Sequence, residues 1–351
     1  MTRMLSVLLF LVGSFLSIFS LAESPEASNQ QFEVDVYSPP VYLSNTRLRY
    51  PRRALTKGVE GWVAMHYMVD PAGNTYDIEI VDSSGDRFIE KAARNAVEKY
   101  KYKPAQYKGE AIHAGANIHF TFDLADQANA WSRKFAFLFR KFRTAAQQAD
   151  HARMEEYLAR LDEVEIVTLF ESAVASLMQG SYAASKNDSE GVRQAYERAL
   201  SLDIDHDLFR KKEQRSGLLL TLMEAQIATG HLRAALNTWE KLEPELSDPQ
   251  LQHRLANQIA EIQRVIASDK PTSVTGKIDA GYKFPYELAK PSFALSNVVG
   301  RLAEAKLYCQ NGRVAFAVVE STAYTLKKDL GACTLILVGD PDTTFEIIDG
   351  A

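Results

Sequence analysis

The chain contains 351 residues, of which 46% are hydrophobic and 24% charged, and it carries a formal net charge of -5 at pH 7. This length predicts about two or three domains, and the composition is typical of soluble globular proteins rather than of fibrous or disordered chains. A mildly acidic chain gains little from counterion release on a phosphate backbone, which argues against nucleic acid as a partner.

The N-terminal segment has the features of an export signal. Arg3 precedes an apolar run over residues 4–21, which ends beside the small residues Ser20 and Ala22. This pattern predicts a signal peptide over residues 1–22. The alternative is an uncleaved inner-membrane anchor, because the run approaches the roughly 18 apolar residues that a spanning helix needs. Both interpretations place the rest of the chain outside the cytoplasm, with membrane contact only through this segment.

A polar segment over residues 23–45 follows, with Pro25, Pro39 and Pro40 and no sustained hydrophobic period. Polar stretches that contain proline and lack a period are typical of linkers. We therefore predict a tether here, with one short strand at residues 32–36.

The first folded domain is predicted over residues 46–125, in the order strand, strand, helix, strand. Residues 62–69 alternate with apolar side chains on both faces, which indicates a buried strand, and residues 76–81 form the returning strand of a hairpin. Residues 87–100 change to a helical period, with apolar side chains at i, i+4 intervals. Residues 112–123 return to alternation and predict the last strand.

This domain resembles the C-terminal domain of the TonB family, because the motifs of that domain follow one another in the same order over about 75 residues. The matching positions are Tyr50, Pro51, Ala54, Gly58, Gly61, Val63, Gly73, Ser84, Gly85 and Pro104. The glycines suit tight turns and positive φ, and the prolines end regular structure. These residues therefore specify a fold rather than a chemistry.

The resemblance implies a binding mode and a partner. In the TonB family an extended peptide of the partner adds as a strand to the sheet edge, and main-chain pairing of this kind needs an open strand rather than special side chains. The candidate edge in this chain is the last strand, with Ala116, Asn117, Ile118, His119, Phe120, Thr121 and Phe122. The implied partner is an outer-membrane TonB-dependent receptor or a protein of its coupling complex, and the implied location is the periplasm.

Two departures from the TonB family narrow this expectation. TonB proteins normally carry the domain at the C-terminus, behind a membrane anchor with a histidine and a long proline-rich spacer. Here the apolar segment has no histidine, and the segment between Ala22 and Tyr50, of roughly 28 residues, reaches at most about 95 Å. We therefore expect a docking module that supports transport rather than a complete energy transducer. The alternative is a structural adaptor of the envelope that uses the fold for assembly.

The central region, residues 130–268, has a helical period throughout. Trp131, Phe135, Leu138, Phe139 and Phe142 form an apolar stripe among basic residues, which predicts either the first helix of a packed scaffold or a helix on a membrane surface.

Two segments of this region resemble each other and the tetratricopeptide repeat. Residues 191–200 match residues 230–242 at an offset of 43, against a usual period of about 34. Generic helical hairpins are the alternative. Either interpretation predicts a scaffold whose surface contacts a protein partner.

The C-terminal region, residues 271–351, returns to strand patterns. Residues 302–309 and 313–320 flank a strong hairpin signal, and residues 333–338 and 344–348 flank a second turn signal at residues 339–342. Cys309 and Cys333 are the only cysteines, and an exported chain predicts a disulfide between them, with two buried thiols as the alternative. The whole chain is thus predicted to be an α+β multidomain protein that ends in a small β-rich domain.

No recognisable catalytic motif occurs in the sequence: G-x-S-x-G, G-x-G-x-x-G and G-x-x-x-x-G-K are all missing. We therefore predict a protein without enzymatic activity or cofactor. Asp203, Asp205 and Asp207 begin like a calcium loop, but Leu208 and Gln214 occupy the positions that need glycine and glutamate.

His66, His113 and His119 could meet on one side of the predicted sheet and hold zinc. Histidines at the surface or satisfied in a core are the commoner case, so we predict no metal site.

Overall fold

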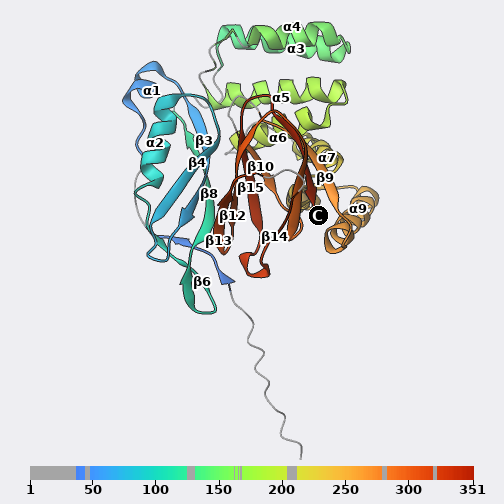
Figure 1. Ribbon diagram of the computed structural model, residues 1–351. Coiled ribbons are helices and arrows are strands. Elements are labelled where there is room, and N and C mark those ends of the chain that lie inside the picture. The colour runs from blue at the N-terminus through green and yellow to red at the C-terminus, as the bar shows by residue number, and fades with distance from the viewer. Residues whose placement is uncertain are drawn as a thin grey trace, which may run out of the picture. The chain divides into compact units, whose positions relative to one another are not determined.

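The computed structural model describes residues 37–43, 48–124, 131–161, 163–164, 166, 168–203, 212–278, 283–318 and 322–351 (Figure 1). The predicted signal peptide, the strand predicted at residues 32–36, and Asp205 and Asp207 lie outside the described residues. The described residues form one compact unit. It combines a TonB-like domain, a helical region and a C-terminal region of sheets, which confirms the predicted α+β class.

The TonB-like domain has the predicted order of strand, strand, helix and strand. Its main elements are α1 (Arg52–Lys57), β3 (Gly61–Val69), β4 (Thr75–Ser83), α2 (Arg87–Val97) and β8 (Ala114–Phe122). The three strands form an antiparallel sheet in the order β4-β3-β8, and α2 packs across one face. The sequence does not predict α1, because six residues are too few to display a hydrophobic period.

Helix α2 is positioned by its cap and by its buried face. The Asp86 carboxylate accepts hydrogen bonds from the backbone N–H groups of Phe88 and Ile89 at 2.8 and 3.0 Å, which caps the helix. Ile89, Ala93 and Val97 then point into the core, where they meet the buried side chains of β3. The amphipathic period that predicts this helix is therefore the period of its contact with the sheet.

After α2 the chain pairs with part of the predicted tether. The Tyr100 N–H donates to the Val97 carbonyl at 2.9 Å, so the helix ends at Val97 rather than at the predicted Tyr100, upstream of Pro104. The short strands that follow are β1 (Tyr37–Ser38) paired with β6 (Ala105–Tyr107), β2 (Val41–Tyr42) paired with β5 (Tyr102–Lys103), and β7 (Glu110–Ile112) paired with β6. Residues 37–42 therefore belong to the domain.

The helical region consists of paired helices. Its elements are α3 (Arg133–Gln147), α4 (His151–Leu161), α5 (Leu169–Ser185), α6 (Ser189–Leu202), α7 (Lys212–Ala228), α8 (Leu232–Leu242), η2 (Glu243–Glu245) and α9 (Pro249–Ala267). Phe135, Leu138 and Phe142 of the predicted stripe are buried against α4 and α5. The tetratricopeptide repeat itself stays a prediction. In the described part of the chain, no helix combines the length and the apolar character needed to cross a membrane.

The β-rich domain is a sandwich of two antiparallel sheets. The first sheet has the order β10 (Lys283–Glu287), β15 (Cys333–Gly339), β12 (Leu302–Cys309) and β13 (Gly312–Phe316). The second has the order β14 (Ala323–Thr325), β11 (Ser292–Val299), β16 (Thr344–Asp349) and β9 (Thr272–Lys277). Phe284 and Leu335 of the first sheet meet Phe293 and Phe345 of the second in the core. We call this domain the sandwich.

The predicted hairpin forms as β12 and β13. The two later predicted strands, β15 and β16, do not pair with each other. β15 and β16 belong to different sheets, because the turn between them crosses the sandwich instead of closing a hairpin. Cys309 and Cys333 stand directly opposite each other on β12 and β15 and form the predicted disulfide. The bond thus joins neighbouring strands of one sheet.

The first sheet of the sandwich covers the TonB-like sheet on the side opposite α2 (Figure 1). Met68 of β3 is fully buried against Tyr308 of β12 and Ile336 of β15, with Val81 and Val338 packed beside them. Burial of this kind contributes about 25 cal/mol for each Å² of apolar surface removed from water. The two sheets therefore share an apolar layer.

Charged side chains surround this apolar layer. Glu79 of β4 forms ion pairs with Lys283, at 2.5 Å, and with Lys306. Asp77, two residues earlier on the same strand, pairs with Arg313. Burial raises the pKa of Glu79, but the hydrogen bonds from its two lysines outweigh that effect and hold this pKa below its usual range. Ion pairs thus connect β4 to the sandwich at Asp77 and at Glu79, two positions on the same face of the strand.

The helical region covers another part of the same face. Trp62 of β3 packs against Leu169 and Ala173 of α5 and Leu202 of α6. The buried Glu60 carboxylate accepts hydrogen bonds from the backbone N–H groups of Leu124 and Leu169, both at 2.8 Å. One carboxylate therefore links the end of β8 to the start of α5.

The charge cluster predicts the effect of Glu79→Ala. Removal of the carboxylate leaves Lys283 and Lys306 without their partner, which should lower the free energy of unfolding by about 2 kcal/mol, below the range for fully buried pairs. Glu79 has a lowered pKa in the folded state, so its contribution is present at neutral pH and lost as the pH falls below the ordinary value of 4.5 and through the folded-state pKa. Urea unfolding at several pH values measures this effect.

The matched control is Glu304→Ala. Glu304 lies 3.6 Å from the same Lys306 but its side chain is 42% exposed, so the change should stay within about 0.5 kcal/mol. A Glu79→Ala protein that unfolds at the wild-type urea concentration at neutral pH would contradict the assigned role of the cluster.

The disulfide predicts a second effect on stability. The half-cystines are 24 residues apart, and loss of a cross-link over such a loop lowers stability by about 3 kcal/mol. The C309A/C333A protein should therefore melt below the wild type in scanning calorimetry. Dithiothreitol should lower the melting temperature of the wild type and leave that of the double variant unchanged. Equal melting temperatures of the wild type and the double variant in the absence of reductant would contradict this prediction.

Candidate partner-binding edge

β8 lies at one edge of the TonB-like sheet and contains all seven predicted edge residues. It pairs with β3 along its whole length, from Gly61 opposite Phe122 to Val69 opposite Ala114, without any shift of register. In the described parts of the chain no strand pairs with its other side. A straight strand of nine residues thus presents an open side to a partner.

The side chains of β8 alternate between two environments. Ala116, Ile118, Phe120 and Phe122 face α2, and the two phenylalanines are buried in the core. Asn117 and His119 point to the opposite face and are exposed. Desolvation lowers the pKa of His119, against the pull of Asp82. The core-facing side chains fix the register of β8, and the backbone remains for pairing.

β4, at the other edge of the same sheet, is closed to a further strand. Its pairing with β3 shifts register twice, and Asp77 adopts a left-handed backbone with φ of 48°. Side chains also occupy its carbonyls: Arg94 donates to Ile78 at 2.7 Å and Lys283 donates to Ile80 at 2.9 Å. Bulges and occupied carbonyls are the usual protection of a sheet edge. The sheet therefore has one regular edge, and it is β8.

The sandwich packs closely on β8 near the beginning of the strand. A Cβ atom at Gly115 would stand 2.9 Å from the Cys309 carbonyl oxygen, so glycine permits the close packing of β12 on this strand. Gly61, at the other end of the paired region, is held as closely by Ser84. Gly115 therefore permits the close approach of the sandwich to β8, and Gly61 permits the close approach of Ser84 and Ile89 within the TonB-like domain.

The motif residues of the TonB resemblance have structural roles. Tyr50 donates to the Val59 carbonyl at 2.7 Å, and burial together with nearby carboxylates raises its pKa to about 12. Gly58 and Gly73 adopt positive φ, of 66° and 81°, where the chain turns after α1 and between β3 and β4. The other positions cap, turn or pack: Pro51, Ala54, Val63, Ser84, Gly85 and Pro104.

The three histidines considered for zinc do not form a site together. His66 and His119 lie on neighbouring strands, opposite Asn117 and Ala64 respectively. His113 lies between β7 and β8 and shares a hydrogen bond of 2.9 Å with the Tyr76 hydroxyl. Within the described ranges, no group of three or more potential ligands could hold a metal ion.

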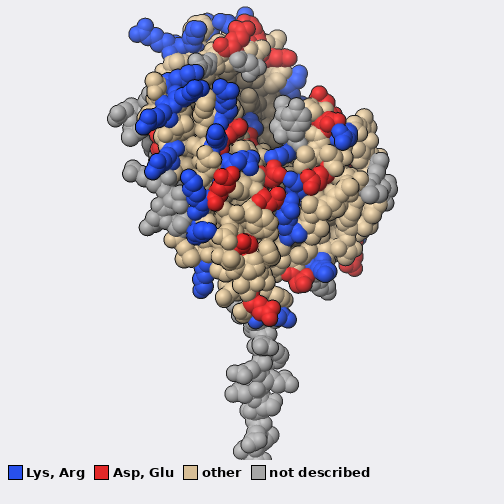
Figure 2. Space-filling model, turned by 60° about the vertical axis from the view of Figure 1, so that its left-hand side comes forward, with Lys and Arg blue, Asp and Glu red and all other residues tan. Residues whose placement is uncertain are grey.

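Lys and Arg side chains form a basic surface on the side of the TonB-like domain that carries α1 and α2. Figure 2, in which the side that carries α1 and α2 comes forward, shows Lys and Arg side chains gathered on this face. Arg53 and Arg87 both stack on Phe88, at 4.9 and 4.7 Å from the ring centroid. Such a field speeds the approach of acidic partners.

No sequence pattern indicates the contacts between the TonB-like sheet and the sandwich. Asp77 and Glu79 stand at alternate positions of β4, a spacing that places both carboxylates on one face. That spacing is the only local signal, and it does not identify Lys283, Lys306 or Arg313 as their partners.

Comparisons with known proteins match the region that contains this edge. Residues 46–124 match the family model described as the Gram-negative bacterial TonB protein C-terminal. Protein TonB of Vibrio cholerae is 28% identical over 103 residues, which cover 29% of this chain and 41% of that protein. Protein tonB2 of Pseudomonas aeruginosa is 30% identical over 83 residues, covering 24% of this chain and 31% of that protein. The chain thus spans about two fifths or less of these curated relatives.

A solved structure is also similar to part of the chain. The solution structure of the TonB CTD of Pseudomonas aeruginosa is 26% identical and covers 25% of this chain and 89% of that chain, with a TM-score of 0.23. The family model, the relatives and the order of the elements agree on the domain. Residues 46–124 are a TonB C-terminal domain, and a helical region and a sandwich follow it along the chain.

Proposed function

We propose that this protein binds an extended segment of an envelope protein as an additional strand on β8. One observation carries the proposal: β8 is the regular edge of a TonB C-terminal domain, unpaired among the described residues, and the other edge is bulged and occupied. Strand addition takes its affinity from main-chain hydrogen bonds and its selectivity from neighbouring side chains. Asn117 and His119 are the exposed side chains that such a segment meets.

The partner is a TonB-dependent outer-membrane receptor or a protein of its coupling complex, and binding supports transport through that receptor. The relatives that share the domain favour this class. A disulfide between the only two cysteines suits an oxidising compartment, which favours the periplasm as the location. The helical region offers a second surface, on which another protein is recruited.

A structural adaptor is the second candidate function, and the packing of the domain favours it over a mobile transducer. Trp62, Met68 and Glu79 attach the TonB C-terminal domain to the rest of the chain. A domain held in this way suits the assembly of envelope proteins. Recovery of assembly proteins without any receptor or coupling protein would favour this function.

Thiol cross-linking tests the position of the partner. Both native cysteines are in the disulfide, so a single added cysteine is the unique free thiol. Asn117→Cys or His119→Cys should cross-link in envelope extracts to a receptor or coupling protein, identified by mass spectrometry. Lys91→Cys, exposed on α2 of the same domain, is the control and should give no such product. Equal cross-linking yields from the β8 variants and from Lys91→Cys would refute docking at β8.

A pair of proline variants tests strand addition itself. Successive N–H groups along a strand point to opposite sides, so only one of Ala116→Pro and Asn117→Pro removes a hydrogen bond to β3. The other variant should keep the wild-type melting temperature and lose at least about tenfold in affinity, because it removes a hydrogen bond to the added strand and blocks its approach. Wild-type affinity of both variants in a pull-down titration would exclude main-chain pairing at β8.

A further inference from the structure

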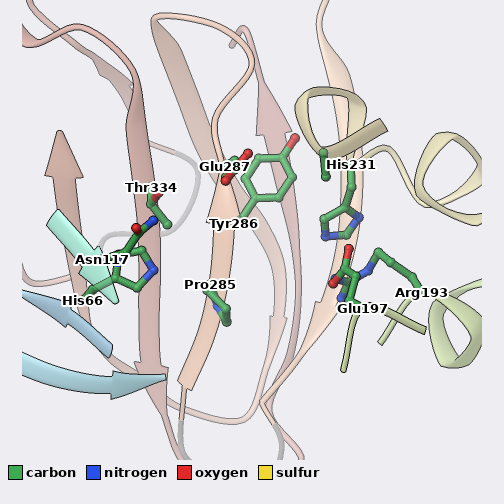
Figure 3. Close-up of a pocket in the computed structure, with 10 residues that line it drawn as sticks. His66, Asn117, Arg193, Glu197, His231, Pro285, Tyr286, Glu287 and Thr334 are labelled. Carbon is green, nitrogen blue, oxygen red and sulfur yellow. The ribbon is translucent and has the colours of Figure 1, made fainter. Parts of the chain in front are cut away.

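A pocket of about 240 Å³ lies where the TonB-like sheet, the helical region and the sandwich meet (Figure 3). Two cross-strand pairs form part of its wall: His66 with Asn117 from β3 and β8, and Glu287 with Thr334 from β10 and β15. Arg193 and Glu197 of α6 and His231 at the start of α8 complete it on the helical side. Junctions between domains are frequent positions of small-molecule sites.

His231 presents an unused hydrogen-bond acceptor at this pocket. The residue is only 6% exposed, and its Nε2 atom has no hydrogen-bond partner among the described residues. Its Nδ1 atom lies 3.0 Å from the Thr229 hydroxyl, which donates its single proton to the Ala225 carbonyl at 2.8 Å. With the hydroxyl proton on the Ala225 carbonyl, Nδ1 carries the imidazole proton and Nε2 keeps a free lone pair. A buried polar atom without a partner is costly, and a bound donor would satisfy it.

Arg193 is the one lysine or arginine among the described residues that line the pocket, and its charge is already neutralised. Its guanidinium donates to both carboxylate oxygens of Glu190, at 2.9 and 2.5 Å, and to Glu197 at 2.7 Å. His231 is neutral because burial and the adjacent Arg193 lower its pKa to about 4, and burial likewise lowers the pKa of His66 to about 4. These groups therefore bring no net positive charge to the pocket.

Glu287 adds an uncompensated negative charge. Within the described residues its carboxylate has no hydrogen-bond donor, and Arg233 nearby directs its guanidinium to the carbonyls of Leu288 and Ala289. Desolvation and the neighbouring Glu197 raise the pKa of Glu287, against the pull of Arg233. Two carboxylates and one neutral imidazole nitrogen thus accept hydrogen bonds at the pocket, and its described lining offers them no unused cationic donor.

We propose that this pocket binds a small molecule that carries a protonated primary amino group on a neutral, hydroxyl-bearing body. The ammonium group donates to the Glu287 carboxylate and to Nε2 of His231. Asn117 and Thr334 bond the hydroxyl groups. Ligands with a carboxylate are disfavoured, because Glu197 and Glu287 repel them and Arg193 is already held by two glutamates.

A ligand at this junction would contact all three parts of the chain at once. It would therefore stabilise their arrangement by mass action, since it binds the assembled protein and not the separated parts. This inference does not rest on docking at β8: Asn117 of that strand lines the pocket, but Glu287 and His231, which receive the ammonium group, lie outside β8.

Matched pairs of small molecules test the chemical class. Glucosamine and ethanolamine each have a counterpart, glucose and ethylene glycol, in which a hydroxyl replaces the amino group. In calorimetric titrations of the full chain at pH 7, an amine should bind at one site per chain and at least about tenfold more tightly than its counterpart, because a charge-assisted hydrogen bond is lost in the latter. An amine that binds should also raise the melting temperature.

A pair of variants tests the site. Glu287→Gln keeps the shape of the side chain and removes its charge, so it should weaken binding of the amine about tenfold. It should not lower the melting temperature of the free protein, because burial already disfavours the charged carboxylate. Glu240→Gln, exposed on α8 outside the pocket, should bind like the wild type. The proposal is overturned if neither amine binds more tightly than its counterpart, or if Glu287→Gln binds like the wild type.

Discussion

The sheet of the TonB C-terminal domain has two faces to remove from water, and the second face determines how the rest of the chain is arranged. β3 carries apolar side chains on both sides, so α2 alone cannot bury it. Trp62 is covered by α5 and α6, and Met68 is covered by the sandwich. An exposed face of this size would be a site of non-specific association. Its burial therefore keeps the three parts together and leaves the edge of the sheet for partners.

The junction is apolar under Met68 and polar where α6 and α8 meet both sheets. Arg193 is held by Glu190 and Glu197 there, so its charge is neutralised without contact to the sandwich. Fully satisfied charges of this kind rigidify a contact, whereas the unpartnered nitrogen of His231 reduces stability. Arg193 therefore supports the structure, whereas the Nε2 atom of His231 is available to a ligand.

Local signals in the sequence predict most of the elements but not their contacts. The apolar residues on both faces of residues 62–69 predict a buried strand, and the i, i+4 period predicts α2. The covering of that strand depends on pairs such as Glu79 with Lys283 and Lys306, which are 204 and 227 residues apart in the chain. A period or a turn motif carries no information about contacts at such distances.

The edge and the pocket differ in how far the sequence predicts them. β8 follows from a family motif and alternation, because an edge strand is a continuous segment. The pocket draws His66, His231 and Glu287 from three parts of the chain, and no local motif joins them. Its position depends on packing, so no sequence pattern could identify it.

The difference between the two edges of the TonB-like sheet also limits how many strands can add to it. Growth of a sheet into a fibre needs two open sides, so that each added strand offers a new edge to the next. Here β4 is bulged and bound to side chains, and of the two edges only β8 is open among the described residues. Two copies that met through β8 would form a closed pair with twofold symmetry, and no third copy could join it. The same asymmetry allows one strand per chain, so a partner with several exposed segments would have to recruit several copies.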